Sequence, residues 1–245
     1  MELIVFTGKN TAYLKLAVAL YMPLHYRLRP FKNHENTSRG NAMNPLKSIT
    51  GTLVAGLALA IVIIFVLGTS GAINPWATWV WFHVFVGIIW IGLLYYFNFV
   101  QVPAVATALS EADSGGPGAA AINKYVAPRA LLWFRWAALA TWITGALALE
   151  AMHTADGSGV VAAFTFASGY AVIGMGAWLG TIMLFNVWGL IWPNQKKILG
   201  LDGKEHSADE IAKAKTVALM ASRTNTLLSI PMLLGMIGQG HGLPF

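Results

Sequence analysis

The sequence contains no cysteine, and this absence removes several kinds of site at once. Disulfide bonds, thiolate metal sites, iron–sulfur clusters and haem attached covalently through C-x-x-C-H all need cysteine side chains. A metal ion or haem bound to this chain must therefore use histidine, methionine, carboxylate or backbone ligands.

Charged residues are also scarce. They make up 11% of the 245 residues, whereas hydrophobic residues make up 56% and the mean hydropathy is +0.60. Soluble globular domains carry about twice that share of charge, so the composition predicts an integral membrane protein whose first partner is the lipid bilayer. The formal net charge of +6 arises from basic residues that lie mostly outside the apolar runs. Basic residues in such places set topology, and we predict no nucleic-acid partner.

Five apolar runs are long enough to cross a hydrocarbon core of about 30 Å as helices. We expect these spans near residues 51–68, 76–105, 130–151, 161–192 and 208–237. The sequence therefore predicts an all-α bundle of five transmembrane helices in a single membrane domain, residues 43–245. Residues 1–42 are a basic extension. This extension is either a disordered or surface-bound segment, or it is not translated because Met43 is the true start.

Lysine and arginine are distributed unevenly among the segments that connect the spans. They lie before the first span, between the second and third, and between the fourth and fifth. The other connecting segments and the carboxyl end lack them. The positive-inside rule then places the amino terminus in the cytoplasm and the carboxyl terminus outside. We expect a multi-pass protein of the bacterial cytoplasmic (inner) membrane.

The second span carries the first functional candidate, His83. Steps of three or four residues from His83 define a stripe of Gly87, Trp90, Leu94, Asn98 and Gln101. Such a stripe predicts the face of the helix that packs on protein and not on lipid. A histidine at membrane depth is costly without a partner, so His83 is either a ligand or a histidine bonded to a carbonyl or hydroxyl group in the bundle.

Five crossings bring three histidines towards the outer end of the bundle. His83 lies about two turns into the second span, His153 follows the third span and His241 follows the fifth. Facing imidazoles are a usual way for a helical bundle to hold haem b, and histidine with methionine also binds copper. We predict haem b, or with less support copper, bound by His83 and His241, with His153 as a further metal-ligand candidate. The alternatives are no cofactor, a solvated His153, and a His241 that is solvated or part of a lid.

A second group of polar residues gathers near the cytoplasmic ends of the spans. It comprises Asn98, Gln101, Arg135, Asn186, Arg223 and Asn225. No acidic residue is expected at this depth, so Arg223 either meets an anion such as a haem propionate or snorkels and bonds carbonyl and amide groups.

Two further patterns concern packing inside the bundle. The deeper tryptophans, which would either line a cofactor pocket or simply pack, are Trp90, Trp136, Trp142 and Trp178. In the fourth span, Gly176-x-x-x-Gly180 permits close approach of another helix.

Three segments resemble one family when they are taken together. They are HVFVGIIWIGLLYYFNFVQVPA from residue 83, LFNVWGLIWPNQKKI from residue 184 and ASRTNTLLSIPMLLGMIGQGH from residue 221. The more specific elements are Asn-Val-Trp…Trp-Pro-Asn-Gln, which begins at Asn186, and Ser-Arg-x-Asn…Pro, which contains Arg223 and Asn225. These segments resemble the membrane domain at the amino terminus of the membrane-bound, cytochrome c-linked bacterial urate oxidases, also called urate hydroxylases.

This resemblance covers about Trp76 to His241 and implies a component of a membrane oxidoreductase. Its cytochrome c domain is not expected here, because the chain lacks cysteine, and Thr224 stands where relatives tend to have histidine. Our leading hypothesis is a membrane redox protein that transfers electrons between a cytochrome c, quinone or other membrane partner and a small substrate. The alternative is a cofactor-free accessory subunit of a larger respiratory or photosynthetic complex. A channel or transporter is disfavoured because the spans lack paired acidic residues and clear broken-helix repeats.

Overall fold

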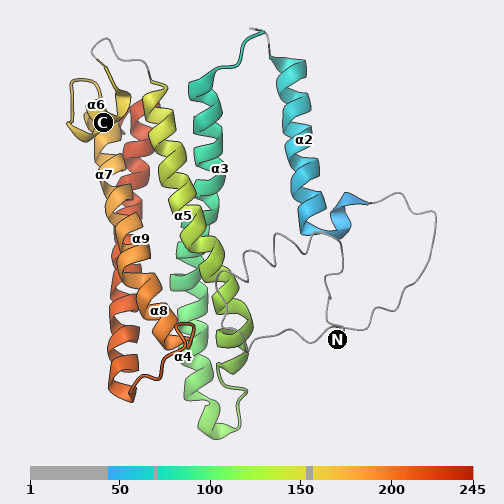
Figure 1. Cartoon of the computed structure of the whole chain (residues 1–245), viewed down its shortest axis with the longest axis vertical. Helices are drawn as coiled ribbons and strands as arrows, with labels where there is room; N and C mark the ends of the chain where they lie inside the picture. The colour runs from blue at the N-terminus through green and yellow to red at the C-terminus, as the bar shows by residue number, and fades with distance from the viewer. Residues whose placement is uncertain (1–43, 69–70, 153–156, 245) are drawn as a thin grey trace. The chain divides into compact units, whose positions relative to one another are not determined.

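The computed structural model describes residues 44–68, 71–152 and 157–244, and it divides the chain into two compact units. The described residues form helices and turns, with no β-strand among them. Five of the helices are long and apolar enough to cross a membrane (Figure 1). The predicted all-α membrane protein with five spanning helices is therefore confirmed.

One unit, residues 24–74, contributes a single spanning helix, α2 (Ile49–Leu67). The short helix η1 (Pro45–Lys47) precedes it, and Ser48 caps its start by accepting a hydrogen bond from the Gly51 N–H at 3.0 Å. None of the 19 residues of α2 is buried. α2 is thus a mainly apolar helix, which suits a lipid environment.

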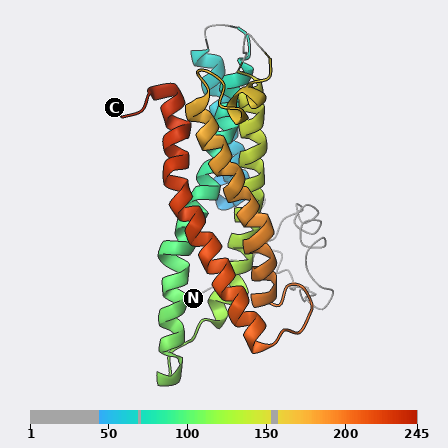
Figure 2. The same cartoon turned by 90° about the vertical axis from the view of Figure 1, so that its left-hand side faces the viewer.

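The other unit holds four spanning helices that form two antiparallel pairs (Figures 1 and 2). In the first pair, α3 (Pro75–Tyr96), the π-helical turn η2 (Phe97–Gln101) and α4 (Val102–Ser110) form one continuous helix beside α5 (Ala127–Glu150). In the second pair, α7 (Ala171–Phe185), the π-helical turn η5 (Asn186–Ile191) and α8 (Trp192–Ile198) run beside α9 (Ala208–His241). The two pairs pack on each other as a four-helix bundle.

Large apolar side chains fill the centre of this bundle. Trp90, Leu94, Phe134, Met183 and Val187 are each at most 2% exposed. Trp90 and Leu94 belong to the stripe that runs from His83 to Gln101, and the side-chain oxygens of Asn98 and Gln101 in that stripe are buried as well. The prediction that this stripe faces protein is therefore confirmed.

Glycines bring α7 and α9 into backbone contact. A Cβ atom on Gly235 would lie 2.8 Å from the Gly176 nitrogen, closer than real Cβ atoms approach. A Cβ on Gly180 would meet nothing within 4 Å. The close approach expected at Gly176 is therefore present, but its partner is Gly235 on the facing helix, and Gly180 takes no part in it.

Each π-helical turn ends two residues before a proline. η2 precedes Pro103, η4 (Ile122–Val126) precedes Pro128 and η5 precedes Pro193. A proline lacks the N–H donor, and its ring collides with the carbonyl four residues earlier, so a wider turn at this point lets the helix continue. The three spanning helices therefore pass through these prolines instead of ending at them.

The stretch 161–192, expected as one span, is divided in the structure. Gly159–Phe164 forms the short helix α6, and the spanning helix begins only at Ala171. Between them, Phe166 and Gly169 have positive φ angles of 56° and 79°, which a continuous right-handed helix does not allow. Gly159 fits closely over the end of α5, where a Cβ would collide with the Leu149 carbonyl oxygen.

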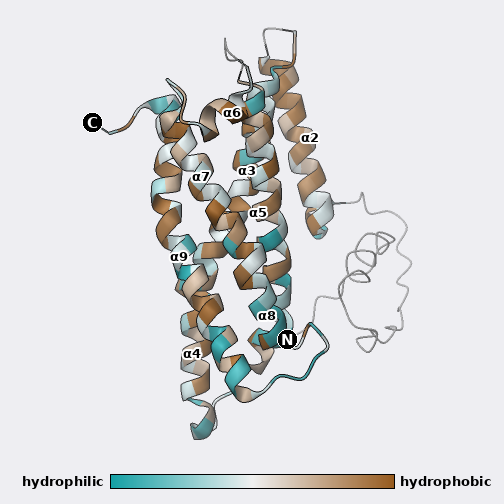
Figure 3. Ribbon diagram, turned by 60° about the vertical axis from the view of Figure 1, so that its left-hand side comes forward, coloured by the Kyte–Doolittle hydropathy of each residue, from teal (hydrophilic) through white to brown (hydrophobic). Residues whose placement is uncertain are grey.

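The two ends of the four-helix bundle differ in polarity. Hydrophilic residues gather around α8, the start of α9 and the far end of α4, whereas the helices between are mainly apolar (Figure 3). This lysine-rich end carries Lys124, Arg129, Lys196, Lys197, Lys204, Lys213 and Lys215. The carboxyl end of α9 lies at the opposite end of the bundle (Figures 1 and 2).

Candidate functional site

His83 is held against the backbone of α5. Its Nδ1 lies 2.8 Å from the carbonyl oxygen of Thr141. The ring also lies directly over Gly145, where a Cβ would come within 2.9 Å of the imidazole. Glycine at position 145 therefore lets the imidazole reach a backbone carbonyl on the neighbouring helix.

The hydrogen bond to Thr141 fixes the role of each ring nitrogen. A carbonyl oxygen only accepts, so Nδ1 carries the proton and, in the neutral ring, Nε2 keeps its lone pair. No group among the described residues is hydrogen-bonded to Nε2. One nitrogen donating to a carbonyl while the other stays available is the usual arrangement of a metal-ligating histidine.

Trp90 lies two helical turns from His83 on the same face of α3. Its side chain is buried, and its indole Nε1 has no hydrogen-bond partner among the described residues. A buried donor without an acceptor costs about 1–3 kcal/mol. Nε2 of His83 and Nε1 of Trp90 thus lie on the same stripe of α3. A ligand or ordered water could form the hydrogen bond or metal bond that each nitrogen lacks.

His241 lies at the same level of the bundle as His83. The Tyr95 hydroxyl and the Ser229 hydroxyl are 3.0 Å apart and join α3 to α9. His83 lies twelve residues before Tyr95 and His241 twelve residues after Ser229, so each is about 18 Å along its helix from this contact. The expectation that both histidines approach one end of the bundle therefore fits the fold.

The structure does not join the two imidazoles in a site. His241 is exposed as the last residue of α9, and among the described residues no hydrogen bond reaches its ring. Those residues also contain no group of three or more histidine, aspartate or glutamate side chains that would hold a metal ion. His153 lies outside the described residues. Ligation by His241 and His153 stays a prediction.

Three of the four deeper tryptophans lie on the outside of the bundle. Trp136, Trp142 and Trp178 are 47%, 37% and 42% exposed. The Trp142 indole donates to the Thr181 hydroxyl at 2.9 Å, and the Trp178 indole donates to the Phe164 carbonyl at 3.0 Å. The interpretation that these three line an interior cofactor pocket is wrong, and only Trp90 of the four is interior.

Asn186 and Asn225 form the centre of the second polar layer, nearer the lysine-rich end. Nδ2 of Asn186 donates to Oδ1 of Asn225 at 2.8 Å, and Nδ2 of Asn225 donates to the Met183 carbonyl at 2.9 Å. Both side chains are buried. This pair therefore ties the start of η5 to the middle of α9.

Asparagine amides also donate hydrogen bonds at η2 and beyond η5. Nδ2 of Asn98 donates to the Leu94 carbonyl at 2.9 Å and to the Ser222 hydroxyl at 2.8 Å. Beyond η5, Nδ2 of Asn194 donates to the Leu190 carbonyl at 2.8 Å. A π turn shifts the backbone hydrogen-bond register, and these amides supply additional donors to carbonyls near the shift. The layer thus stabilises the wide turns that the prolines require.

The two arginines of this layer have different surroundings. Arg135 is buried, and its guanidinium carbon lies 3.8 Å from the centre of the Trp192 ring. Arg223 is exposed on α9, eighteen residues before His241 and so about 27 Å from it along the helix. Because His83 lies at the level of His241, Arg223 and the neighbouring Asn186–Asn225 pair belong to a layer separate from His83.

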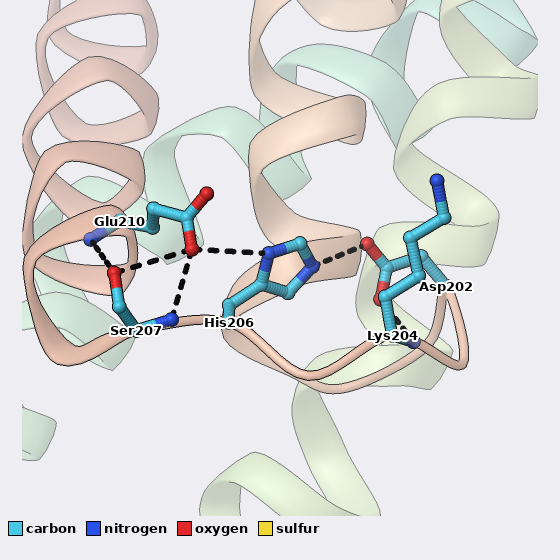
Figure 4. A network of polar contacts seen from close by, with 5 residues as sticks. All are labelled: Asp202, Lys204, His206, Ser207 and Glu210. Atoms are coloured by element: carbon cyan, nitrogen blue, oxygen red, sulfur yellow. Dashed lines mark hydrogen bonds and ion pairs between the residues drawn. The ribbon is translucent and has the colours of Figure 1, made fainter.

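A third polar cluster fixes the start of α9 (Figure 4). Nε2 of His206 lies 2.7 Å from Oδ2 of Asp202, and this hydrogen bond lowers the pKa of the Asp202 carboxyl. The Ser207 hydroxyl accepts from the Glu210 N–H at 3.2 Å, and the Glu210 carboxylate accepts from the Ser207 N–H at 2.9 Å. Together these two hydrogen bonds form a capping box at the start of α9.

Sequence reasoning missed two of the contacts that define these layers. It did not identify the Thr141 carbonyl as the partner of His83, because every residue carries a carbonyl and none is visible as an acceptor in a sequence. It also missed the contact of Tyr95 with Ser229. The intervals of three and four residues between Ser222, Asn225 and Ser229 indicate a polar face of α9, but they do not identify its partner on α3.

These features define a multi-pass membrane protein. In one half of its bundle a backbone carbonyl orients a histidine, and in the other half two asparagines form a buried hydrogen-bonded pair. Residues 157–245 match the family described as urate oxidase N-terminal. The match confirms the resemblance over the segment from α6 to the carboxyl end, which includes Asn186, Arg223 and Asn225. His83 and Trp90 lie outside the matched residues. No match was found among curated proteins or among solved structures.

Proposed function

We propose that this chain is the membrane-embedded part of a urate oxidase-like redox system and that it binds haem b through His83. The observation that carries the proposal is the orientation of His83, whose Nδ1 is engaged by the Thr141 carbonyl while Nε2 has no hydrogen-bond partner in the described chain. The similarity of residues 157–245 to the urate oxidase N-terminal family supports the redox setting.

The residues around His83 suit a haem better than a bare metal ion. A haem iron needs only one or two axial protein ligands, whereas a copper or zinc ion needs several donors in one place. His83 supplies one axial nitrogen, and the unpaired indole N–H of Trp90 suits an acceptor group on the bound molecule. His241 and His153 are the proposed partner ligands. Copper remains the second choice, with the same histidines.

Bound haem b would supply one-electron transfer. The chain's own residues would orient the ligating ring through Thr141 and Gly145 and keep the site within the apolar half of the bundle. We propose that the electrons pass between a small substrate and a cytochrome c or quinone-linked partner in the same membrane.

The test is spectroscopic and uses the intact chain. The protein is expressed with a haem supply, purified in a mild detergent, and assayed for a Soret band, for haem stoichiometry and for iron and copper content. We expect a Soret band in the wild type and at least a tenfold loss of bound haem in His83→Ala. His206→Ala is the matched control, because His206 lies at the other end of the bundle, and it should retain the haem.

A cofactor-free accessory subunit is the second candidate, and the exposed position of His241 favours it. It predicts no Soret band and no stoichiometric metal in the wild type, copurification with a larger membrane complex, and an effect of His83→Ala on stability alone. That combination of results would overturn the haem proposal.

A further inference from the structure

The side-chain amide of Asn98 holds a buried acceptor at the contact of η2 with α9. Its Nδ2 donates to the Leu94 carbonyl at 2.9 Å and to the Ser222 hydroxyl at 2.8 Å. Because a backbone carbonyl only accepts, the amide nitrogen must face Leu94, and the other end of the amide is the oxygen. This Oδ1 is buried, and no described residue donates a hydrogen bond to it.

Gln101 presents a second buried acceptor three residues further along η2. Its Oε1 is buried, and the Gln101 side chain forms no hydrogen bond within the described residues. Residues three apart lie on the same face of a helix, with about 5–6 Å between their Cβ atoms. A buried acceptor left unpaired costs about 1–3 kcal/mol. Two such acceptors in one turn therefore suit a molecule that carries hydrogen-bond donors.

Ser222 adds a donor to the same place. Its hydroxyl accepts from Asn98, and within the described chain its own proton is given to no acceptor. A hydroxyl group accepts and donates at the same time. We name this set of Asn98, Gln101 and Ser222 the η2–α9 cluster. It offers two acceptors and one donor, all on neutral side chains.

The η2–α9 cluster lies at the edge of the bundle and not in its centre. Gln101 and Ser222 are half-buried, and Phe99, next to Asn98, is 65% exposed. If Trp76 marks one membrane interface, Asn98 lies about 33 Å further along the helix, at the far margin of a hydrocarbon core of about 30 Å. A lipid-soluble molecule therefore reaches the cluster from the bilayer with its polar end at the interface.

Ionic ligands do not suit this cluster. In the two helices that form it, the nearest acidic residues among those described are Glu111 and Glu210, each at least ten residues away. A metal cation would lack the carboxylates that it prefers. An anion, such as the phosphate of a lipid head group, would meet two amide oxygens that only accept. The chemistry of the cluster therefore selects an uncharged molecule with hydroxyl groups.

An aromatic surface adjoins the amides. The rings of Tyr95 and Phe99 are stacked with their centroids 5.3 Å apart, and the Tyr95 hydroxyl lies 3.0 Å from that of Ser229 on α9. Flat rings pack well on such a surface in offset or edge-to-face geometry. A ring that carries the hydroxyl groups thus has an apolar surface beside the polar cluster.

We propose that the η2–α9 cluster binds the head group of a quinol, whose two hydroxyls donate to Asn98 Oδ1 and Gln101 Oε1 while one of them accepts from Ser222. A quinol is uncharged, dissolves in lipid and carries its two hydroxyls on one flat ring. The carbonyls of the oxidised quinone only accept, so the quinone can use the Ser222 donor but not the two amide oxygens. Asn98 lies about 22 Å along the helix from His83, so this is a second site, separate from the proposed haem ligand.

The test measures the binding of decylubiquinol and decylubiquinone to the full chain in lipid nanodiscs, kept anaerobic, with binding to protein-free discs subtracted. We expect saturable binding of one quinol per chain, with a dissociation constant at least fivefold below that of the quinone. Gln101→Met removes one acceptor but breaks no hydrogen bond of the described chain. It should leave the unfolding temperature unchanged and weaken quinol binding at least fivefold.

Gln195→Met is the matched control. Gln195 on α8 is half-buried as well, and its side chain forms no hydrogen bond within the described residues, so this variant should bind quinol like the wild type. Ser222→Ala removes the donor and should weaken quinone binding more than quinol binding. His83→Ala should bind quinol like the wild type, so a failure of the haem proposal leaves this measurement unchanged.

Three results would overturn the proposal. The first is a wild type that binds no more quinol than protein-free discs do. The second is equal quinol affinity in Gln101→Met and the wild type, which would show that the buried oxygen receives no hydrogen bond from the ligand. The third is an equal loss in Gln101→Met and Gln195→Met, which would show that quinol binds the chain without using the η2–α9 cluster.

Discussion

Asn186 and Asn225 share a buried hydrogen bond of 2.8 Å, although they lie 39 residues apart in the sequence. Each belongs to one of the two more specific motifs of the family resemblance, and both lie in the segment that matches the urate oxidase N-terminal family. The bond therefore shows a physical reason for the two motifs to occur together. It also ties a π-helical turn to the facing helix.

Removing either member of this pair should destabilise the bundle. In Asn225→Leu, the Asn186 amide and the Met183 carbonyl each lose a buried partner, and a buried polar group left unpaired costs about 1–3 kcal/mol. We expect a lower free energy of unfolding in detergent for Asn186→Leu and Asn225→Leu. Thr224→Ala, exposed on the same helix, should change it by less than about 0.5 kcal/mol.

The double variant measures the bond itself. Hydrogen bonds between membrane helices average about 0.6 kcal/mol of coupling in double-mutant cycles, so the loss in the double variant should be smaller than the sum of the two single losses. Strict additivity would show that the two amides act independently.

Gly145 should control the position of His83 because the absence of a side chain there leaves room for the imidazole ring. In Gly145→Ala the new methyl carbon would lie 2.9 Å from atoms of the His83 ring, so the ring must move away from the Thr141 carbonyl. If His83 ligates haem, loss of this orienting bond should weaken haem binding by about 10–100-fold. Haem content after purification measures this effect.

Gly87 provides the matched control on the facing helix. A Cβ there meets the Thr141 methyl group at 3.6 Å, which is ordinary contact, so Gly87→Ala should retain the haem. Equal haem content in both variants would show that the contact of His83 with Thr141 does not govern binding.

Much of the fold could be predicted because its signals are local. The length of each apolar run predicts a span, and steps of three or four residues identify the face of α3 and η2, from His83 to Gln101, that packs on protein. The capping box at Ser207 and Glu210 is likewise defined by four consecutive residues. None of these predictions needs knowledge of a distant contact.

The errors arose where the structure depends on a contact between distant residues or on contact with lipid. VVAAFTFASGYAV reads as continuous apolar helix, yet α6 ends at Phe164 and the chain turns with positive φ angles at Phe166 and Gly169. Trp136, Trp142 and Trp178 were expected either to line a cofactor pocket or to pack in the bundle, and they lie on its outside. Lipid tails are as apolar as a protein core, so hydrophobicity alone does not separate the two locations in a membrane protein.

The crossing of α7 and α9 should be intolerant of any side chain at Gly235. A Cβ at that position would lie 2.8 Å from the Gly176 nitrogen and 2.9 Å from the Val172 carbonyl oxygen, and neither backbone atom has freedom to move aside. We expect Gly235→Ala to lower the free energy of unfolding by about 1–3 kcal/mol, as overpacking typically does. Gly240→Ala, in open space on the same helix, should have little effect, and an equal loss in both would contradict the contact.

The connection between α8 and α9 should loosen in acid. The hydrogen bond from His206 lowers the pKa of the Asp202 carboxyl below its ordinary value of 3.8. Because the folded pKa lies below the unfolded one, the stabilisation is fully present above the unfolded pKa and is lost as the pH falls through the folded pKa. Surface pairs contribute about 0–1 kcal/mol, so we expect local opening and not global unfolding.

Local opening is measurable by amide exchange in residues 199–207 as the pH is lowered from 5 towards 3, after correction for the intrinsic pH dependence of exchange. The wild type should lose protection in this window. Asp202→Asn should start with less protection and lose less, because position 202 then has no proton to gain, while the Glu210 carboxylate, whose pKa its bonds to Ser207 also lower, still gains one. Lys204→Ala serves as the control, since it keeps the backbone bond from residue 204 to Asp202 and should follow the wild type. A wild-type segment whose protection is constant over the window would show that the pairing of Asp202 with His206 does not stabilise the start of α9.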